Sequence, residues 1–201
     1  MDEGLHAERL DAVMAALRRC DARQVVDLGC GTGSLLQRLL SEAQIERVIG
    51  LDVSAGSLAE ARQYLSEAGL PVDAPRMHWR HASFTQLQAD LIGIDAATLI
   101  ETIEHIDPGQ LGQLGEAVFA GLQPACLIVT TPNVEYNRLF DMPAGVFRDP
   151  DHKFEWPRAR FRQWGWKQAE RYGYRVRFSG IGPEDIELGP PTQMAVFTRK
   201  T

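Results

Sequence analysis

The sequence predicts an α/β fold with a mostly parallel sheet, helices on both of its faces and an antiparallel pair of strands at the C-terminus. Two patterns lead to this prediction. Short apolar segments of strand length alternate along the chain with longer segments whose apolar residues recur at helical spacing. After the last helical segment, two further segments alternate apolar and polar residues, which is typical of paired antiparallel strands. We therefore expect a single domain over residues 1–201.

The first part of the chain predicts three strands and three helices in alternation. In chain order we expect a helix over 5–17, a strand over 24–28, a helix over 34–41, a strand over 47–51, a helix over 54–68 and a strand over 77–81. Ser54 is a typical N-cap residue for the third helix, and Gly69 ends that helix shortly before Pro71.

The second part continues the pattern but contains one long interruption. We expect a strand over 95–100, a helical stretch ending at 122, a strand over 126–130, a helix over 158–172, and terminal strands over 174–179 and 193–198. The stretch from Pro132 to Pro157 has no clear periodicity. Because structureless connections of this length usually carry function, we interpret residues 132–157 as a functional loop inserted in the domain.

Composition and cysteine content favour a soluble protein of the cytoplasm. The chain is 44% hydrophobic and 24% charged, and its N-terminus reads MDEG, which is acidic and unlike a signal peptide. No apolar run approaches the length of a membrane span, so no membrane partner is expected. Cys20, Cys30 and Cys126 lack the spacing of metal ligands, which favours reduced thiols and a cytoplasmic location.

The charge distribution is uneven. The net charge of −6 argues against a protein that coats long nucleic acid. Between Phe147 and Arg177, however, nine Lys or Arg stand against four Asp or Glu, so this segment carries +5 and the remainder −11. The segment can hold a few phosphates, or it can be an ordinary solvated helix face.

A glycine-rich turn follows the first strand. Asp27 begins the run D-L-G-C-G-T-G, in which Gly29, Gly31 and Gly33 let the backbone approach a ligand at a helix N-terminus. Asp52 ends the second strand about twenty residues later, where a carboxylate can accept hydrogen bonds from the hydroxyls of a ribose. A tight turn with a capping Asp is the alternative.

This turn and its acid resemble those of the class I S-adenosylmethionine-dependent methyltransferases. The resemblance implies a Rossmann-like, seven-stranded sheet whose turn holds the methionine end of S-adenosylmethionine and whose Asp52 holds the ribose. It also implies that Ser83 and Phe84, which follow the third strand, flank the adenine.

A second group of polar residues follows the fourth strand. On a helical turn, Glu101, Glu104 and His105 would share one face, at the edge of the sheet where ligands bind in such folds. Two carboxylates and an imidazole are suitable ligands for Mg²⁺ or Mn²⁺, and imidazole favours Mn²⁺. An exposed helix start with acids placed near the dipole is the alternative.

Three motifs together resemble one narrower family. They are E-x-x-E-H at 101–105, T-P-N-x-E-Y-N at 131–137 and D-H-x-F-E-W at 151–156. The combination resembles the small-RNA 3′-terminal 2′-O-methyltransferases, the Hua-enhancer family, over the chain from about Leu10 onward. The resemblance implies methylation of the 2′-hydroxyl at the 3′ end of an RNA and a metal that also binds the 2′,3′-diol. It implies four metal ligands: Glu101, Glu104, His105 and His152. We expect an imidazole, preferably that of His105, to assist removal of the proton from the 2′-hydroxyl.

The loop supplies further candidates. Four polar residues follow the fifth strand and are expected to contact substrate, with loop-closing hydrogen bonds as the alternative: Asn133, Glu135, Tyr136 and Asn137. Phe154 and Trp156 are expected to pack the loop onto the domain rather than to stack on bases. Pro157 and Arg160 stand where bacterial relatives carry a hydroxyl residue and an acid, a departure expected to alter the helix cap or the basic surface.

The family also implies partners. Its bacterial members are linked to RNA repair beside a kinase-phosphatase-ligase, so RNA repair or protection of small-RNA ends is the expected role. Two alternatives remain open. One is a metal-dependent methyltransferase of a small vicinal diol, against which the basic segment and D-H-x-F-E-W count. The other is a non-catalytic module that binds RNA 3′ ends, against which the intact turn and ligand motifs count.

Overall fold

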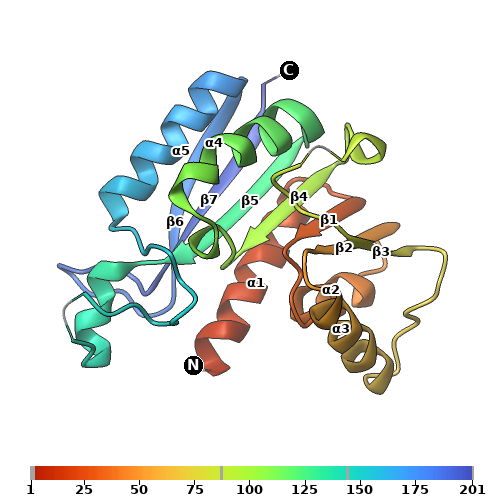
Figure 1. Ribbon diagram of the computed structural model, residues 1–201, viewed down its shortest axis with the longest axis horizontal. Helices are drawn as coiled ribbons and strands as arrows, with labels where there is room; N and C mark the ends of the chain where they lie inside the picture. The colour runs from red at the N-terminus through yellow and green to blue at the C-terminus, as the bar shows by residue number, and fades with distance from the viewer. Residues whose placement is uncertain (1–2, 87, 144, 201) are drawn as a thin grey trace.

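The computed structural model describes residues 3–86, 88–143 and 145–200, and in these ranges seven strands form one sheet (Figure 1). The strands are β1 (Gln24–Leu28), β2 (Arg47–Asp52), β3 (Met77–His81), β4 (Ala96–Ile100), β5 (Cys126–Pro132), β6 (Tyr174–Ile181) and β7 (Thr192–Arg199). Their order is β3-β2-β1-β4-β5-β7-β6. The first five strands run parallel, and β7 is antiparallel to both β5 and β6. The predicted sheet and its terminal hairpin are confirmed.

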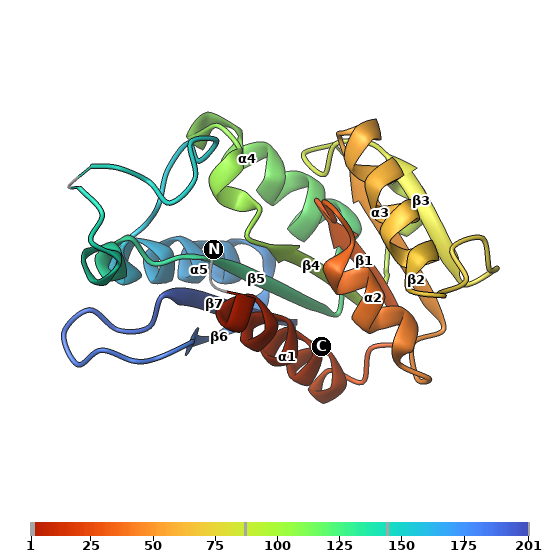
Figure 2. The same cartoon turned by 90° about the horizontal axis from the view of Figure 1, so that it is seen from below.

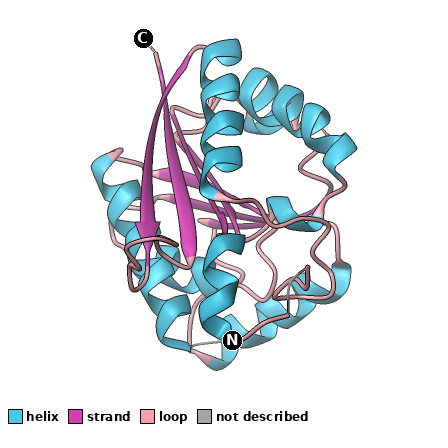
Figure 3. Cartoon of the chain, turned by 90° about the vertical axis from the view of Figure 1, so that its left-hand side faces the viewer, coloured by secondary structure: helices cyan, strands magenta, loops and turns pink. Residues whose placement is uncertain are grey.

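Helices cover both faces of this sheet (Figure 3). The α-helices are α1 (Glu3–Arg19), α2 (Ser34–Ser41), α3 (Ala55–Glu67), α4 (Leu111–Leu114) and α5 (Arg158–Tyr172), and α4 continues as the π-helix η4 (Gly115–Leu122). Short 3₁₀ turns are η1 (Ala89–Leu91), η2 (Ile103–His105), η3 (Pro108–Gln110) and η5 (Val134–Phe140). The Ser54 hydroxyl accepts a hydrogen bond from the Ser57 amide, which confirms the predicted N-cap of α3.

The core consists of two clusters, one on each face. Val26 and Leu28 of β1 point to the cluster that holds η4 and α5, whereas Val25 points to the cluster that holds α1, α2 and α3. Strands buried on both faces in this way have apolar residues at nearly every position. This explains why β1, β4 and β5 are recognisable as short continuous apolar runs.

The region after β4 differs from the single helical stretch that was expected. Glu101 adopts a left-handed backbone with φ of 49°, and the first helical turn begins only at Ile103. The prediction that Glu101 shares one helical turn with Glu104 and His105 is therefore wrong. Pro108 then begins η3, and α4 starts at Leu111.

The connection between β5 and α5 is more ordered than predicted. It begins with η5, because the Asn133 side chain accepts a hydrogen bond from the Glu135 amide and starts the turn. Phe154 and Trp156 are buried and stacked on each other with ring centroids 4.4 Å apart, as the packing prediction required. In Figures 1 and 2 this connection lies beside the one between β6 and β7, at the same end of the sheet. Ala144 lies outside the described residues.

The cysteines correct one further expectation. Cys20 at the end of α1 and Cys126 at the start of β5 form a disulfide with Cα atoms 6.3 Å apart, so the prediction of three reduced thiols is wrong. Their sequence spacing of 106 residues carries no signal of this contact, which arises because α1 packs beside β5. Cys30 is buried and free. Among the described helices, none is both long and apolar enough to cross a membrane.

Candidate active site

The glycine turn joins β1 to α2. Gly29, Gly31 and Gly33 all have positive φ, which residues with a side chain rarely adopt. A Cβ atom on Gly29 would lie 2.6 Å from Cγ2 of Thr102, whereas one on Gly31 would meet nothing within 4 Å. Gly29 therefore closes the turn tightly against the protein, and Gly31 faces open space. Such a turn fits a ligand that approaches the backbone closely.

Asp52 holds the rim of this turn. Its Oδ2 accepts a hydrogen bond of 2.9 Å from the Gly31 amide, and its Oδ1 accepts one of 2.8 Å from the Ser54 amide. The side chain is only partly buried. Because each carboxylate oxygen accepts more than one hydrogen bond, Asp52 retains acceptor capacity for the hydroxyls of a ribose.

Asp27 lies deeper than the other residues predicted to hold the cofactor. It is buried, and its Oδ1 accepts a hydrogen bond of 2.7 Å from Oγ1 of Thr98 on β4. Burial raises the pKa of Asp27 to about 7, against the opposing effect of the Thr98 hydrogen bond. In this conformation Asp27 fastens the start of the turn to β4.

Ser83 and Phe84 lie after β3, as predicted. Phe84 is buried, and its Cε1 would lie 3.6 Å from a Cβ atom on Gly29, so its ring packs beside the turn. The Ser83 hydroxyl bonds to that of Thr85 at 2.7 Å. The two residues therefore lie beside the turn, and their contact with adenine stays a prediction.

The metal candidates come from two elements. Glu104 and His105 lie on η2, and His152 lies in the connection between β5 and α5. One ligand atom from each of the three lies within 4.8 Å of the others. The Lys153 amide donates to the Glu104 carbonyl at 2.7 Å, which fastens the connection onto η2 and brings the two histidines together.

Glu104 carries the strongest indication that these residues fit a cation. Its side chain is 0% exposed, and Oε2 accepts a hydrogen bond of 2.9 Å from the Thr131 hydroxyl. Its Oε1 is buried with no hydrogen-bond partner among the described residues. Burial, and then the nearby Glu101, raise the pKa of Glu104 well above its usual value. A buried carboxylate oxygen without a partner is costly, and a bound divalent cation would offset that cost.

Glu101 lies beside this cluster but outside it. Its Oε1 accepts a hydrogen bond of 2.9 Å from the Thr130 hydroxyl, and its Oε2 lies 3.2 Å from a guanidinium nitrogen of Arg9. Burial raises the pKa of Glu101, and Arg9 opposes that rise. Arg9 reaches the site from α1, and no local sequence signal indicates it.

The histidines are prepared to act as ligands. Nδ1 of His152 lies 2.6 Å from Oε1 of Glu155, so Nδ1 donates its proton there and Nε2 remains free to bind a cation. Burial opposes ionisation of Glu155, but hydrogen bonds led by that from His152 outweigh it and lower the pKa of Glu155. Burial and the neighbouring His152 lower the pKa of His105, which favours its neutral form.

Comparisons with known proteins agree with these features. A family model described as a methyltransferase domain matches residues 25–125. The mouse protein named small RNA 2′-O-methyltransferase is 37% identical over 203 residues, covering 97% of this chain and 51% of its own length. The crystal structure of the methyltransferase domain of bacterial CtHen1 is 42% identical, with a TM-score of 0.88, and the match covers 98% of this chain and 100% of that one. The chain belongs to the Hen1 family.

The Hen1-family chain spans about half the length of its mouse relative. A chain in the structure of the Pnkp1/Rnl/Hen1 RNA repair complex shares the fold, with a TM-score of 0.72 and 22% identity; the match covers 97% of this chain and 41% of that one.

The four loop residues predicted to contact substrate make loop-closing contacts in this Hen1-family chain. The Asn133 amide nitrogen donates to the carbonyls of Leu188 and Pro190 at 2.8 and 2.9 Å. Asn137 donates to Glu155 and accepts from Arg148, both at 2.6 Å. Tyr136 is buried against Phe140, with ring centroids 5.2 Å apart, and Glu135 pairs with Arg158. Their contact with substrate stays a prediction.

Sequence reasoning did not identify Arg148 as a central residue of this loop. Its guanidinium donates to the carbonyls of Asn133 and Pro191 at 2.7 and 2.9 Å, and its amide donates to Glu155 at 2.7 Å. Arg148 thus belongs to the buried support of His152 rather than to a surface that holds phosphate.

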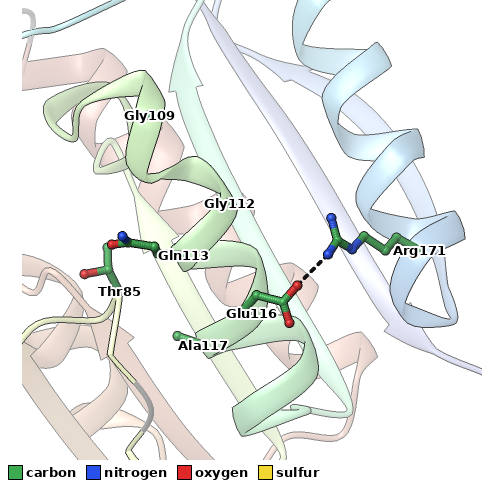
Figure 4. Close-up of a pocket in the computed structure, with 7 residues that line it drawn as sticks. All are labelled: Thr85, Gly109, Gly112, Gln113, Glu116, Ala117 and Arg171. Carbon is green, nitrogen blue, oxygen red and sulfur yellow. Dashed lines mark hydrogen bonds and ion pairs between the residues drawn. The ribbon is translucent and has the colours of Figure 1, made fainter.

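A large hollow lies away from this cluster, on the surface of α4 and η4. It measures about 660 Å³ and is lined by Thr85, Gln113 and Arg171 among others, and none of the four predicted metal ligands lines it (Figure 4). At its edge Arg171 of α5 donates to Glu116 of η4 at 2.6 Å. This ion pair accounts for one of the nine cations of the basic segment.

Proposed function

We propose that this Hen1-family domain transfers a methyl group from S-adenosylmethionine to the 2′-hydroxyl of the 3′-terminal nucleotide of an RNA, with the help of a divalent cation. One observation carries the proposal: the buried Glu104, with an oxygen that lacks a partner, lies within ligand distance of His105 and His152. The name of the mouse relative, small RNA 2′-O-methyltransferase, supports the choice of substrate.

The glycine turn would hold the cofactor. Gly29, Gly31 and Gly33 would admit the methionine end, with Asp27 bracing the turn against β4. Asp52 would accept hydrogen bonds from the ribose, and Ser83 and Phe84 would flank the adenine. S-adenosylmethionine, when bound, supplies an electrophilic methyl group.

Glu104, His105 and His152 would hold Mn²⁺ or Mg²⁺. The E-x-x-E-H motif adds Glu101, which lies beside them, as the fourth ligand of the proposal. The two imidazoles favour Mn²⁺. When bound there, such a cation would lower the pKa of a ribose hydroxyl and help to fix its position. Glu155 orients His152, and the neutral His105 is suited to accept the proton that the hydroxyl loses. Adjacent 2′- and 3′-hydroxyls exist together only at a free 3′ end, so this ligand set would also recognise the terminus.

We extend the proposal to RNA repair, in partnership with a kinase-phosphatase-ligase. The chain from the Pnkp1/Rnl/Hen1 RNA repair complex supports this extension through its shared fold. Protection of small-RNA ends is the corresponding role suggested by the name of the mouse relative.

The test is transfer of labelled methyl from S-adenosylmethionine to short RNAs, with Mn²⁺, with Mg²⁺ or with a chelator. Matched RNAs would end in a free 2′,3′-diol, a 2′-deoxy, a 3′-deoxy or a 3′-phosphate terminus. We expect metal-dependent transfer to the free diol alone. Transfer that survives the chelator would disprove the role of the cation. A catechol tested in the same assay covers the alternatives: its labelling without any labelled RNA would favour the small-diol alternative, and cofactor binding without any transfer would favour a binding module.

A further inference from the structure

A second hollow lies at the same end of the sheet as the metal candidates. It measures about 240 Å³ and lies between the start of α5, the end of β6 and the connection from β6 to β7. We name it the α5–β6 hollow. Its polar lining includes Arg158, Arg162, Ser179 and Glu184, and Phe161 and Phe178 contribute apolar surface.

The strand register relates this hollow to the metal candidates. Pro132 of β5 pairs with Thr192 of β7, which in turn pairs with Ile181 of β6. The residue before Pro132 is Thr131, whose hydroxyl binds Glu104. Ser179 and Gly180, at the end of β6, line the hollow. Two strand spacings of about 4.8 Å each therefore separate β5 from the strand that lines the hollow. A chain of a few nucleotides can span such a distance.

The chemistry of the hollow suits a phosphodiester. Arg158 is already paired with Glu135, but the Arg162 side chain has no partner among the described residues. A guanidinium on a concave surface is a typical donor to phosphate oxygens. Glu184 places one acid at the lining, so the net charge of the hollow is modest. This favours one phosphate over a long duplex backbone.

An exposed aromatic residue adjoins this donor. Trp166 lies one helical turn after Arg162 on α5 and is 58% exposed. Its ring meets that of Phe178, a lining residue, edge-on with centroids 5.6 Å apart. Base–aromatic stacking contributes to the binding of single strands, and an exposed indole beside a phosphate donor is suited to that role.

We propose that single-stranded RNA leaving the metal site crosses the α5–β6 hollow. A backbone phosphate a few nucleotides before the 3′ end binds Arg162, and a neighbouring base stacks on Trp166. The inference rests on the proposed function, because it takes the 3′ end to lie at Glu104, His105 and His152. It explains how a protein with net charge −6 holds RNA with a small number of contacts.

The test compares Arg162→Gln and Trp166→Ala with Arg19→Gln, which removes an equal charge from an exposed position on α1. Methyl transfer would be measured on a dinucleotide and on a single-stranded RNA of about ten nucleotides. We expect Arg162→Gln and Trp166→Ala each to raise KM for the longer RNA about tenfold, with KM for the dinucleotide and kcat unchanged. Arg162→Gln should also reduce the salt dependence of binding, whereas Arg19→Gln should match the wild type.

Two outcomes separate this inference from the proposed function. Methylation of both RNAs with the same KM in all variants would overturn the hollow as part of the RNA path and leave the function intact. If no RNA is methylated, the proposed function fails, and fluorescence anisotropy with labelled RNA still decides the inference. Affinity about tenfold weaker in Arg162→Gln and Trp166→Ala than in Arg19→Gln would support it, and equal affinities would overturn it.

Discussion

Arg9 and Glu101 form an ion pair between α1 and the end of β4, with a guanidinium nitrogen 3.2 Å from Oε2 of Glu101. Arg9 is 4% exposed, and the same nitrogen lies 3.3 Å from the Thr192 hydroxyl on β7. Glu101 meets it from a left-handed backbone, a strained conformation that typically persists at functional sites. The carboxylate of Glu101 thus links the N-terminal helix to the metal candidates.

Replacing Arg9 by Met should leave the partly buried Glu101 without its cation. We expect Arg9→Met to lower the free energy of unfolding by about 3 kcal/mol in metal-free buffer, as for other broken buried pairs. Adding Glu101→Gln to Arg9→Met should recover most of that loss, because the uncompensated charge is removed. Urea unfolding of the wild type, both single variants and the double variant measures this coupling. Additive effects of the two substitutions would contradict it.

Glu104→Gln should separate stability from metal binding. Because the Glu104 carboxylate is buried with one oxygen unpartnered, the neutral amide should leave the metal-free melting temperature unchanged or raised. In the wild type, Mn²⁺ at a hundred times its Kd should stabilise the fold by about 2.7 kcal/mol, and the variant should lose this gain. Thermal melts with and without Mn²⁺ check both expectations. A full Mn²⁺ shift in Glu104→Gln would exclude Glu104 as a ligand.

Asp52→Ala should weaken cofactor binding. The variant loses the acceptor for the ribose and the brace that holds the Gly31 amide, so we expect a Kd for S-adenosylmethionine raised about tenfold to a hundredfold. Isothermal titration calorimetry measures the change. Glu46→Gln, at an exposed position before β2, is the matched control and should bind like the wild type. An unchanged Kd in Asp52→Ala would place the ribose elsewhere.

Glu135 caps α5, whose N-cap residue, Pro157, makes no side-chain cap of its own. Its Oε2 accepts from the Arg158 amide at 2.9 Å and from Nε of Arg158 at 2.8 Å. Burial opposes ionisation of Glu135, but these hydrogen bonds outweigh it and lower its pKa. We expect Glu135→Ala to cost about 1 kcal/mol, or about 3 °C in melting temperature. Glu135→Gln keeps an acceptor oxygen and should therefore lose less stability. Equal losses in the two variants would show that the hydrogen bond from the Arg158 amide to this oxygen does not contribute.

Asp27 should make stability depend on pH. Its pKa in the fold is about 7, above the value of 3.8 for an unperturbed Asp, so its contribution is full below about pH 4 and declines as pH rises to about 7. Asp27→Asn removes this titration. As pH rises across that range, the free energy of unfolding of the wild type should therefore fall relative to that of Asp27→Asn, by at most about 4 kcal/mol. Urea unfolding at several pH values measures it, and a constant difference would contradict the assignment.

Much of the fold could be predicted because its signals are local. Alternating apolar periods located the strands, Ser54 marked the start of α3, and the glycine turn with Asp52 indicated the proposed cofactor site. His152 was assigned through motifs that no spacing rule links to Glu104, and the structure places it within ligand distance of Glu104 and His105. The same local reasoning failed at Glu101, because a left-handed residue interrupted the expected helical turn.

The sequence by itself determined the order of the elements, the turn chemistry and the residue types available for a metal site. Only the tertiary structure decided which of those groups meet. Arg9 reaches Glu101, Cys20 pairs with Cys126, and Glu135 caps α5 across 23 residues. Periodicity and capping depend on neighbours within one or two helical turns, so they can be recognised in the chain. Contacts between distant segments depend on how whole helices pack on the sheet, and no local pattern records that packing.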